Sequence, residues 1–230
     1  MNPTYYDDLF SQKQKILQEF LDAAEAKGSP TVISHLYKAG QALFHSGTQP
    51  FGVYYIHHGL VKLFKSGKAG RQHITYMGAA GDLFGYRALL AGELYKVSAE
   101  ALVDSKLSFI ERDFFMDFLK KDKLLPHLLL KTLSLELGDV EDRLLGAVQV
   151  PAEQRVARVL HFLMKNYGVS AEGFLNIQLS RSDMAQLSDT ADETLMRYLG
   201  DLEDKKMILR SKKKIKILDP GAIRNEAGIG

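Results

Sequence analysis

The chain has 230 residues, of which 46% are hydrophobic and 25% are charged, and its formal net charge is +2. This is the composition of an ordinary globular protein, and the length is sufficient for two domains. The sequence contains no cysteine, which excludes disulfides, thiol redox switching, and zinc sites or iron–sulfur clusters held by cysteine. It has no run of 18 apolar residues and no basic start followed by an apolar core. We therefore expect neither a membrane span nor a signal peptide, and a cytoplasmic protein.

Residues 1–28 are predicted to form a helix that packs as an arm against the rest of the chain. Apolar residues recur among polar ones at roughly helical spacing, and the pattern ends at Gly28-Ser29-Pro30. The apolar positions are Leu9, Phe10, Ile16, Leu17, Phe20 and Leu21.

Residues 31–111 lack this helical pattern and consist of short apolar runs separated by glycines. Residues 53–56, 60–64 and 73–77 have the composition of strands. Many short strands at regular spacing with glycine turns predict a β-sandwich or β-roll. Helical character returns at residues 114–119.

Residues 124–147 are predicted to form a long helix with a seam of apolar residues three and four apart. The seam residues are Leu130, Leu133, Leu137, Val140 and Leu144. A single helix that faces a core also has an apolar stripe, but further leucines lie off this seam. One stripe can then pack on the β-roll while the seam meets a second copy of the chain, as in a coiled coil. Residues 148–151 break the pattern and are the predicted hinge.

A second helix is predicted over residues 152–167, with an apolar stripe at Val156, Val159, Leu160 and Leu163 and with Arg155 and Arg158 on its flank. Residues 174–179 are predicted to form a short strand.

Residues 179–204 have the pattern of two short helices joined by a tight turn. Ser180 is a suitable N-cap, with Asp183 in the position of a capping box. Asp189 stands where such a turn favours glycine, and aspartate tolerates the left-handed conformation better than most residues. The second helix, which begins near residues 190–192, has apolar residues at Leu195, Leu199 and Leu202. This arrangement predicts a helix-turn-helix, whose second helix enters the DNA major groove.

The exposed face of the second predicted helix carries side chains that can read base pairs. Arg197 can donate two hydrogen bonds to guanine, and Glu193, four residues earlier on the same face, can accept one from cytosine. Thr194 and Ser182 lie where the starts of helices meet phosphates. The plainer alternatives are a capping box between Glu193 and Thr190 and an exposed ion pair between Arg197 and Asp201.

Residues 205–218 contain seven basic residues and no acidic one. Residues 207–209 and 215–218 are predicted to form a hairpin that turns around residues 211–214. A cationic wing of this kind suits backbone phosphates, although a lysine run can also be a solvated turn. Taken in order and spacing, these features favour DNA binding. The predicted contact residues are Ser180, Ser182, Asp192, Glu193, Thr194, Arg197, Lys212, Lys213 and Lys214.

The segments YKAGQALFHSGTQPFGVYYIHHGLVKLFKSG (37–67) and GRQHITYMGAAGDLFGYRALLAGELYKVSAEAL (70–102) resemble the cyclic-nucleotide-binding β-roll of the cAMP receptor protein/fumarate-nitrate regulator (CRP/FNR) family. The segment TADETLMRYL (190–199) is similar to that family's SRETVSRxL pattern, so the resemblance covers essentially the whole chain. It implies a β-roll, a long helix that pairs two protomers, and a winged helix-turn-helix. Glycines at the usual turns of the roll are Gly40, Gly47, Gly59, Gly81 and Gly85.

The resemblance fails at the residues that hold a cyclic nucleotide. Where the family's nucleotide binders have Gly-Glu-Leu, this chain has Gly85-Tyr86-Arg87, and where they have Arg-Ser or Arg-Thr it has residues close to Tyr95-Lys96-Val97-Ser98. The ribose-binding carboxylate and the phosphate-binding arginine are therefore replaced, and we do not expect cAMP to bind. The family's iron–sulfur sensors use N-terminal cysteines, which these 230 residues lack. For an effector of another kind, the predicted pocket residues are Phe84, Tyr86, Arg87, Tyr95 and Lys96.

Haem is a further possibility for the roll, because histidine and methionine ligate haem iron. The candidate ligands are His45, His57, His58, His73 and Met77. Exposed or packed histidines without a ligand are commoner.

The sequence thus predicts an α+β chain that consists of an N-terminal helix and β-roll (1–123), a dimerisation helix and hinge (124–150) and a winged helix-turn-helix (151–230). We expect a homodimeric transcription regulator, not an enzyme, that binds a near-palindromic site on double-stranded DNA, with RNA polymerase as a partner if it activates. The alternative is a haem-based gas, redox or nitrosative-stress sensor of the same fold, or a regulator with an atypical small-molecule effector. Many members of the family that this chain resembles carry another DNA-contacting residue at the position of Asp192. An acid there repels phosphate, so we expect a half-site that differs from TGTGA, while a TGA-like core stays open as an alternative.

Overall fold

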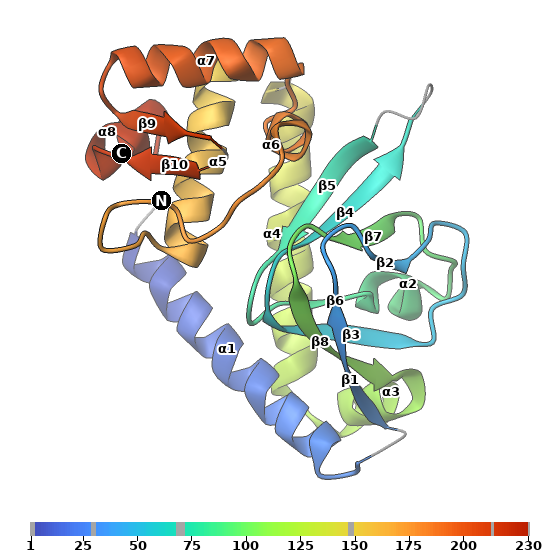
Figure 1. Ribbon diagram of the computed structural model, residues 1–230. Helices are drawn as coiled ribbons and strands as arrows, with labels where there is room; N and C mark the ends of the chain where they lie inside the picture. Colours follow the sequence, from blue (N-terminus) through green and yellow to red (C-terminus); the bar gives the residue numbers. More distant parts are fainter. Residues whose placement is uncertain (1–2, 29–30, 68–71, 147–149, 213, 230) are drawn as a thin grey trace. The chain divides into compact units, whose positions relative to one another are not determined.

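The computed structural model describes residues 3–28, 31–67, 72–146, 150–212 and 214–229, and of residues 3–12, 139 and 142–146 the backbone only (Figure 1). Lys213 and residues 148 and 149 of the predicted hinge lie outside the described residues. The chain divides into two compact units, one formed by Met1–Lys65 and Thr75–Leu144 and the other by Ser66–Ile74 and Leu145–Gly230. Within the described ranges, no helix has both the length and the apolar character needed to cross a membrane.

The first unit contains two four-stranded sheets with helices around them. One sheet has the strand order β1-β8-β3-β6 and the other β2-β7-β4-β5. The strands are β1 (Val32–Tyr37), β2 (Ala42–Phe44), β3 (Gly52–His58), β4 (Val61–Ser66), β5 (Gln72–Gly78), β6 (Leu83–Phe84), β7 (Ser98–Ala101) and β8 (Ser105–Glu111). The helices are α1 (Pro3–Glu25), α2 (Tyr86–Ala91), α3 (Arg112–Lys121) and α4 (Leu124–Gly146). The predicted β-roll is confirmed.

Strand β3 separates two hydrophobic cores, because successive side chains of a strand point to opposite faces of the sheet. Val53 and Tyr55 belong to a core shared with α1, α3 and α4. Tyr54 and Ile56 belong to a second core, which strands of both sheets share. The first core explains why α1 forms: Ile16, Leu17, Phe20, Leu21 and Ala24 lie on one face of that helix and are all buried.

Helix α4 presents one apolar stripe to the core and leaves a second one exposed. Its first turn is capped by Asp122, whose Oδ1 accepts hydrogen bonds from the amides of Leu124 and Leu125. Leu125, Leu128 and Leu129 are buried in the first core. On the predicted seam, Leu130, Leu137 and Val140 are 66%, 59% and 48% exposed, while Leu133 packs partly against the core. The side chain of Leu144 lies outside the described part.

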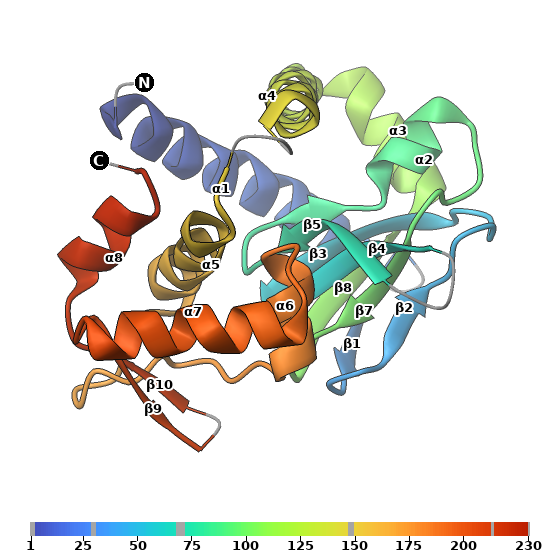
Figure 2. The same cartoon turned by 90° about the horizontal axis from the view of Figure 1, so that it is seen from above.

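The second unit arranges short helices and a hairpin around α5 (Figure 2). Its elements are α5 (Ala152–Tyr167), α6 (Arg181–Leu187), α7 (Asp192–Asp204), β9 (Ile208–Ser211), β10 (Lys214–Ile217) and α8 (Pro220–Glu226). The predicted stripe on α5 is buried, and this helix packs against α6, α7 and α8. β9 and β10 form the predicted wing hairpin.

The strand predicted over residues 174–179 is wrong. Phe174 and Leu175 form only isolated bridges, to Lys216 and Val169. Asn176 bonds back to the end of α5 instead, through its amide to the carbonyl of Gly168 and through its side chain to that of Tyr167. Because Asn176 makes these bonds, the extended pairing of residues 174–179 ends after Phe174 and Leu175.

Candidate nucleic-acid interface

The turn between α6 and α7 has the geometry that the sequence predicts. Ser180 caps α6, and its Oγ accepts a hydrogen bond from the amide of Asp183 at 3.0 Å. Asp189 has a φ of 47°, in the left-handed region. Ala185 is buried where the two helices approach each other, and its carbonyl accepts the amide of Thr190 at 2.9 Å. Figure 1 shows α6 nearly end-on while α7 lies across the view, so the helices meet at a steep angle.

Asp189→Gly is expected to stabilise the second unit by about 0.5–1 kcal/mol, because glycine adopts a positive φ without a steric penalty. Asp189→Val should destabilise it, since a β-branched side chain is disfavoured there. Urea unfolding of the parent and both variants measures their free energies of unfolding, which should decrease from the glycine variant to the parent and then to the valine variant. An equal stability for the glycine and valine variants would contradict the strain at this position.

Helix α7 buries one face and exposes the face that was predicted to read bases. Leu195, Leu199 and Leu202 are buried, whereas Glu193 and Arg197 are exposed. The capping box with Thr190 does not form, because the N-cap is Ala191 and the Thr190 hydroxyl bonds Ser188 Oγ at 2.9 Å. The carboxylate of Glu193, at the start of α7, is therefore available to accept a hydrogen bond from a base.

Arg197 is held by a neighbour that sequence reasoning missed. Its guanidinium lies over the ring of Tyr198, 4.8 Å from the centroid, and its Nη2 donates to Tyr198 Oη at 3.1 Å. In the described part of the chain it forms no ion pair with Asp201. The contact with Tyr198 limits the rotamers of Arg197 and leaves the rest of its donor fork free.

The two predicted serine contacts are engaged within α6. Ser180 Oγ also bonds Asp183 Oδ2, and Ser182 Oγ accepts from the side-chain amide of Gln186 at 3.1 Å. The hydroxyl proton of Ser182 remains free to donate to a phosphate. Thr194 is half-buried on α7, and Asp192 is exposed on its first turn.

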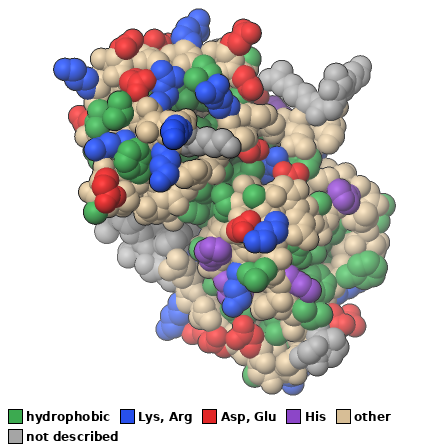
Figure 3. Space-filling model, viewed as in Figure 1, with side chains coloured by type: hydrophobic (Ala, Val, Ile, Leu, Met, Phe, Trp, Pro, Cys, Tyr) green, Lys and Arg blue, Asp and Glu red, His purple; other side chains and the backbone are tan. Residues whose placement is uncertain are grey.

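The wing hairpin uses some of its basic residues to hold itself in place. The Arg210 amide and Nε both donate to Glu203 of α7, each at 2.7 Å, and these bonds hold the pKa of Glu203 below its ordinary value. Before the hairpin, Lys205 at the C-cap of α7 pairs with Glu226 of α8 at 3.1 Å. The Nζ atoms of Lys214 and Lys216 lie 5.9 Å and 5.8 Å from the ring centroid of Phe174. On the face shown in Figure 3, Lys and Arg side chains gather over this unit, with acidic side chains among them.

Lys214→Ala is expected to weaken binding to all DNA sequences alike and to reduce the slope of log affinity against log salt by about 1. The reason is that this exposed wing lysine is predicted to contact a phosphate rather than a base. The same was predicted for Lys213, which lies outside the described residues. Titrations of a bound and an unrelated duplex at several salt concentrations measure the effect, and a loss confined to one sequence would contradict it.

The structure does not bring the five predicted effector residues together. Phe84 and Tyr95 lie in the core between the sheets, where Tyr95 stacks on Phe44 at 3.8 Å and Phe84 on Tyr54 at 5.3 Å. Tyr86 lies in the other core. The remaining two are exposed and engaged elsewhere: Arg87 pairs with Glu136 of α4 at 3.5 Å, and Lys96 pairs with Glu93. Packing thus places three of these side chains in two separate cores, and ion pairing holds the other two at separate places on the surface.

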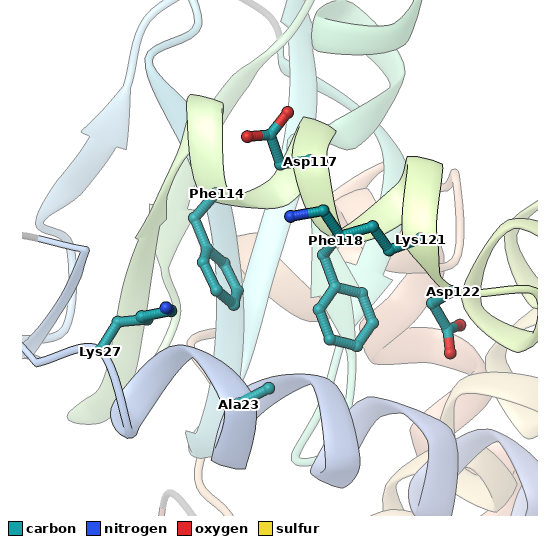
Figure 4. A pocket seen from close by; sticks show the side chains of 7 residues that line it. All are labelled: Ala23, Lys27, Phe114, Asp117, Phe118, Lys121 and Asp122. Atoms are coloured by element: carbon teal, nitrogen blue, oxygen red, sulfur yellow. The ribbon is translucent and has the colours of Figure 1, made fainter.

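A cavity of about 500 Å³ lies in the first unit, between α1 and α3 (Figure 4). The rings of Phe114 and Phe118 point from α3 toward α1. None of the predicted effector residues lines it. Of its two carboxylates, Asp122 caps α4 and Asp117 pairs with Lys120. The lining residues are Ala23, Lys27, Phe114, Asp117, Phe118, Lys121 and Asp122.

The candidate haem ligands lie on separate strand ends and faces. His45, His58 and His73 are exposed, and Met77 is half-buried on β5. His57 is engaged in a polar chain: its Nε2 lies 2.7 Å from Ser108 Oγ, which is 2.8 Å from Ser34 Oγ. Burial, followed by the charge of Lys106, lowers the pKa of His57.

The lowered pKa predicts that His57 makes the free energy of unfolding depend on pH. The unfolded chain binds this proton at the ordinary histidine pKa of about 6.5, before the folded chain does, so stability falls as pH drops below that value and is fully present above it. His57→Gln should reduce the loss of stability between pH 7 and pH 5.5. Urea unfolding of parent and variant at both pH values measures this, and equal losses would rule out a contribution from His57.

Comparisons with known proteins agree with this architecture. The family model described as cyclic nucleotide-binding domain matches residues 34–122, and the one described as Crp-like helix-turn-helix domain matches residues 154–226. Regulatory protein HlyX of Actinobacillus pleuropneumoniae is 28% identical over 180 residues, which cover 77% of this chain and 74% of that protein. The fumarate and nitrate reduction regulatory protein of Escherichia coli K12 is 28% identical over 192 residues, which cover 82% and 76%.

Solved structures share the fold. FixK2 from Bradyrhizobium japonicum superimposes with a TM-score of 0.72 at 22% identity, over 84% of this chain and 96% of that one. A transcriptional regulator of the CRP/FNR family from Thermus thermophilus gives a TM-score of 0.70 at 22% identity, over 85% and 98%. With a cyclic-nucleotide-binding-type β-roll followed by a Crp-like DNA-binding helix-turn-helix, the chain belongs to the CRP/FNR family of transcription regulators.

Proposed function

We propose that the chain acts in the cytoplasm as a homodimer that binds a near-palindromic site on double-stranded DNA, with one α7 helix in the major groove of each half-site. The observation that carries this proposal is the pair of free faces: the reading face of α7 and the apolar stripe of α4. A single helix-turn-helix reads a short half-site, and a two-fold dimer supplies the second one.

The stripe on α4 supports the dimer because it is apolar, exposed and spaced in heptads. Leu130, Leu137 and Val140 are each about half exposed or more, although Leu125 and Leu129 on the same helix are buried. Large apolar side chains gathered along one line of a helix favour association with a second helix.

The reading face supports base recognition by Glu193 and Arg197. Both are exposed, they are four residues apart on α7, and neither is neutralised by the alternative pairings considered from the sequence. The wing adds Lys212 and Lys214 for phosphate contacts.

Selection of binding sites from a random pool of duplex DNA tests this function, combined with the molar mass of the protein in solution. We expect enrichment of sites with two inverted half-sites about one helical turn apart, and the mass of a dimer. Enrichment of no sequence, or of a single half-site by a monomer, would contradict the proposal.

We also propose that cAMP does not control this regulator. Tyr86 stands where nucleotide binders have their ribose-binding glutamate and is buried in the core, and Arg87 is paired with Glu136. Titration of cAMP into the DNA-binding assay should leave the affinity unchanged. Tighter binding with cAMP would overturn this reading, and a haem titration followed by visible absorbance tests the sensor alternative in the same assay.

A further inference from the structure

Arg155 connects two separate segments of the second unit through three backbone carbonyls. Its Nε donates to the carbonyl of Ser188 at 2.9 Å and its Nη2 to that of Asp189 at 2.9 Å. Its Nη1 donates to the carbonyl of Val150 at 2.7 Å. Ser188 and Asp189 form the helix-turn-helix turn, whereas Val150 belongs to the predicted hinge and lies just before α5.

Both turn carbonyls lie where a helix offers them no partner. Carbonyls at the end of a helix lack partners within that helix, and Ser188 and Asp189 are the C-cap of α6 and the residue after it. The Ser188 side chain is buried and already bonds Met184 and Thr190. The two carbonyls accept their hydrogen bonds from outside α6, and the flat guanidinium of Arg155 reaches them and the Val150 carbonyl at once. A lysine ammonium, which is a compact point charge, does not match this fork.

The position of the turn controls the reading face. Helix α7 begins at Asp192, three residues after Asp189, and Glu193 lies on its first turn. A shift of the turn would therefore displace Glu193 and Arg197 together, and base reading requires their donors and acceptors in fixed register.

We infer that Arg155 is a positioning residue for DNA reading, which fixes the helix-turn-helix turn to the segment that enters the DNA-binding unit. This inference rests on the proposed function. It assigns to Arg155 no contact with DNA, so its loss should reduce the discrimination between sequences and not the attraction to phosphates.

The chain offers a matched control on the same helix. Arg158 lies on α5 close to Arg155 and also donates its Nε to a backbone carbonyl, that of Ala227, at 3.0 Å. This bond holds the end of α8 and does not reach the turn. Arg158→Met thus removes the same charge and a comparable bond without releasing the turn.

The test compares affinities for the selected DNA site and for a duplex with scrambled half-sites. Arg155→Met should reduce the ratio of the two affinities by about tenfold or more, while Arg158→Met should change it by less than about twofold. The affinity ratio of Arg155→Lys should lie between that of the parent and that of Arg155→Met. Thermal unfolding of each variant shows whether the protein is folded at the temperature of the assay.

A folded Arg155→Met protein with the parent's ratio would overturn the inference, as would an equal loss for Arg158→Met. If Arg155→Met does not fold, Arg155→Lys against Arg158→Lys gives the same comparison. The parent is measured first: a parent that does not discriminate would refute the proposed function, whereas a discriminating parent with an unaffected Arg155→Met refutes the positioning role alone.

Discussion

Replacing Arg197 by alanine is expected to reduce the preference for the bound site over a mismatched one by about 1–3 kcal/mol. Arg197 is exposed on α7, and its guanidinium is steadied by Tyr198 through a ring contact and a hydrogen bond. A restrained guanidinium loses less side-chain entropy when it forms a bidentate pair with guanine. The alanine variant loses that pair and leaves the base without its partner.

The measurement is the affinity of the parent and of Arg197→Ala for the selected site and for single-base variants of each half-site. The loss should concentrate at one base pair of the half-site. Lys214→Ala is the control, because it removes one positive charge from the wing and should lower all affinities by a similar factor. Undiminished binding of the selected site by Arg197→Ala would show that another residue reads the base.

Leu137→Glu is expected to weaken the dimer by about a hundredfold or more. A leucine buried at a two-fold interface contributes from both copies, at about 1.5–3 kcal/mol for each fully buried side chain. The glutamate also introduces a charge that would have to be buried without a partner. If each protomer reads one half-site, as we propose, DNA affinity should fall when the dimer weakens.

Analytical ultracentrifugation over a range of concentrations measures the dimer constant. The matched control is Leu94→Glu, which places the same charge on a leucine that is 49% exposed in the loop after α2. Leu94→Glu should remain dimeric. A Leu137→Glu protein that stays dimeric at low concentration would place the interface on another surface.

The elements that the sequence predicts well are those whose cause is local. Ser180 caps α6 with its own side chain, Asp189 supplies the left-handed turn, and leucines at helical spacing bury one face of α7. The exposed stripe on α4 was predicted for the same reason, since the seam and the off-seam leucines can be separated by counting along the helix.

The failures concern residues whose direction is decided by distant partners. Arg87 turns to Glu136 on α4, and Tyr86 enters a core built by helices far away in sequence. The anchoring of Arg155 was missed for another reason. Its acceptors are backbone carbonyls, and every residue has one, so the sequence does not indicate which carbonyls Arg155 bonds. In the same way, Asn176 ended a predicted strand by bonding the carbonyl of Tyr167.

The stacked rings between the two sheets of the roll set a condition on any ligand that enters there. Phe44 and Tyr95, and likewise Tyr54 and Phe84, already fill the space that such a ligand would occupy. If the displaced arrangement were populated at about 1%, the apparent affinity would be about a hundredfold weaker than the intrinsic one. Tyr54 and Tyr95 belong to the ten tyrosines of a chain without tryptophan, so a ligand that displaced their rings should change the near-ultraviolet circular dichroism of the protein, with or without DNA.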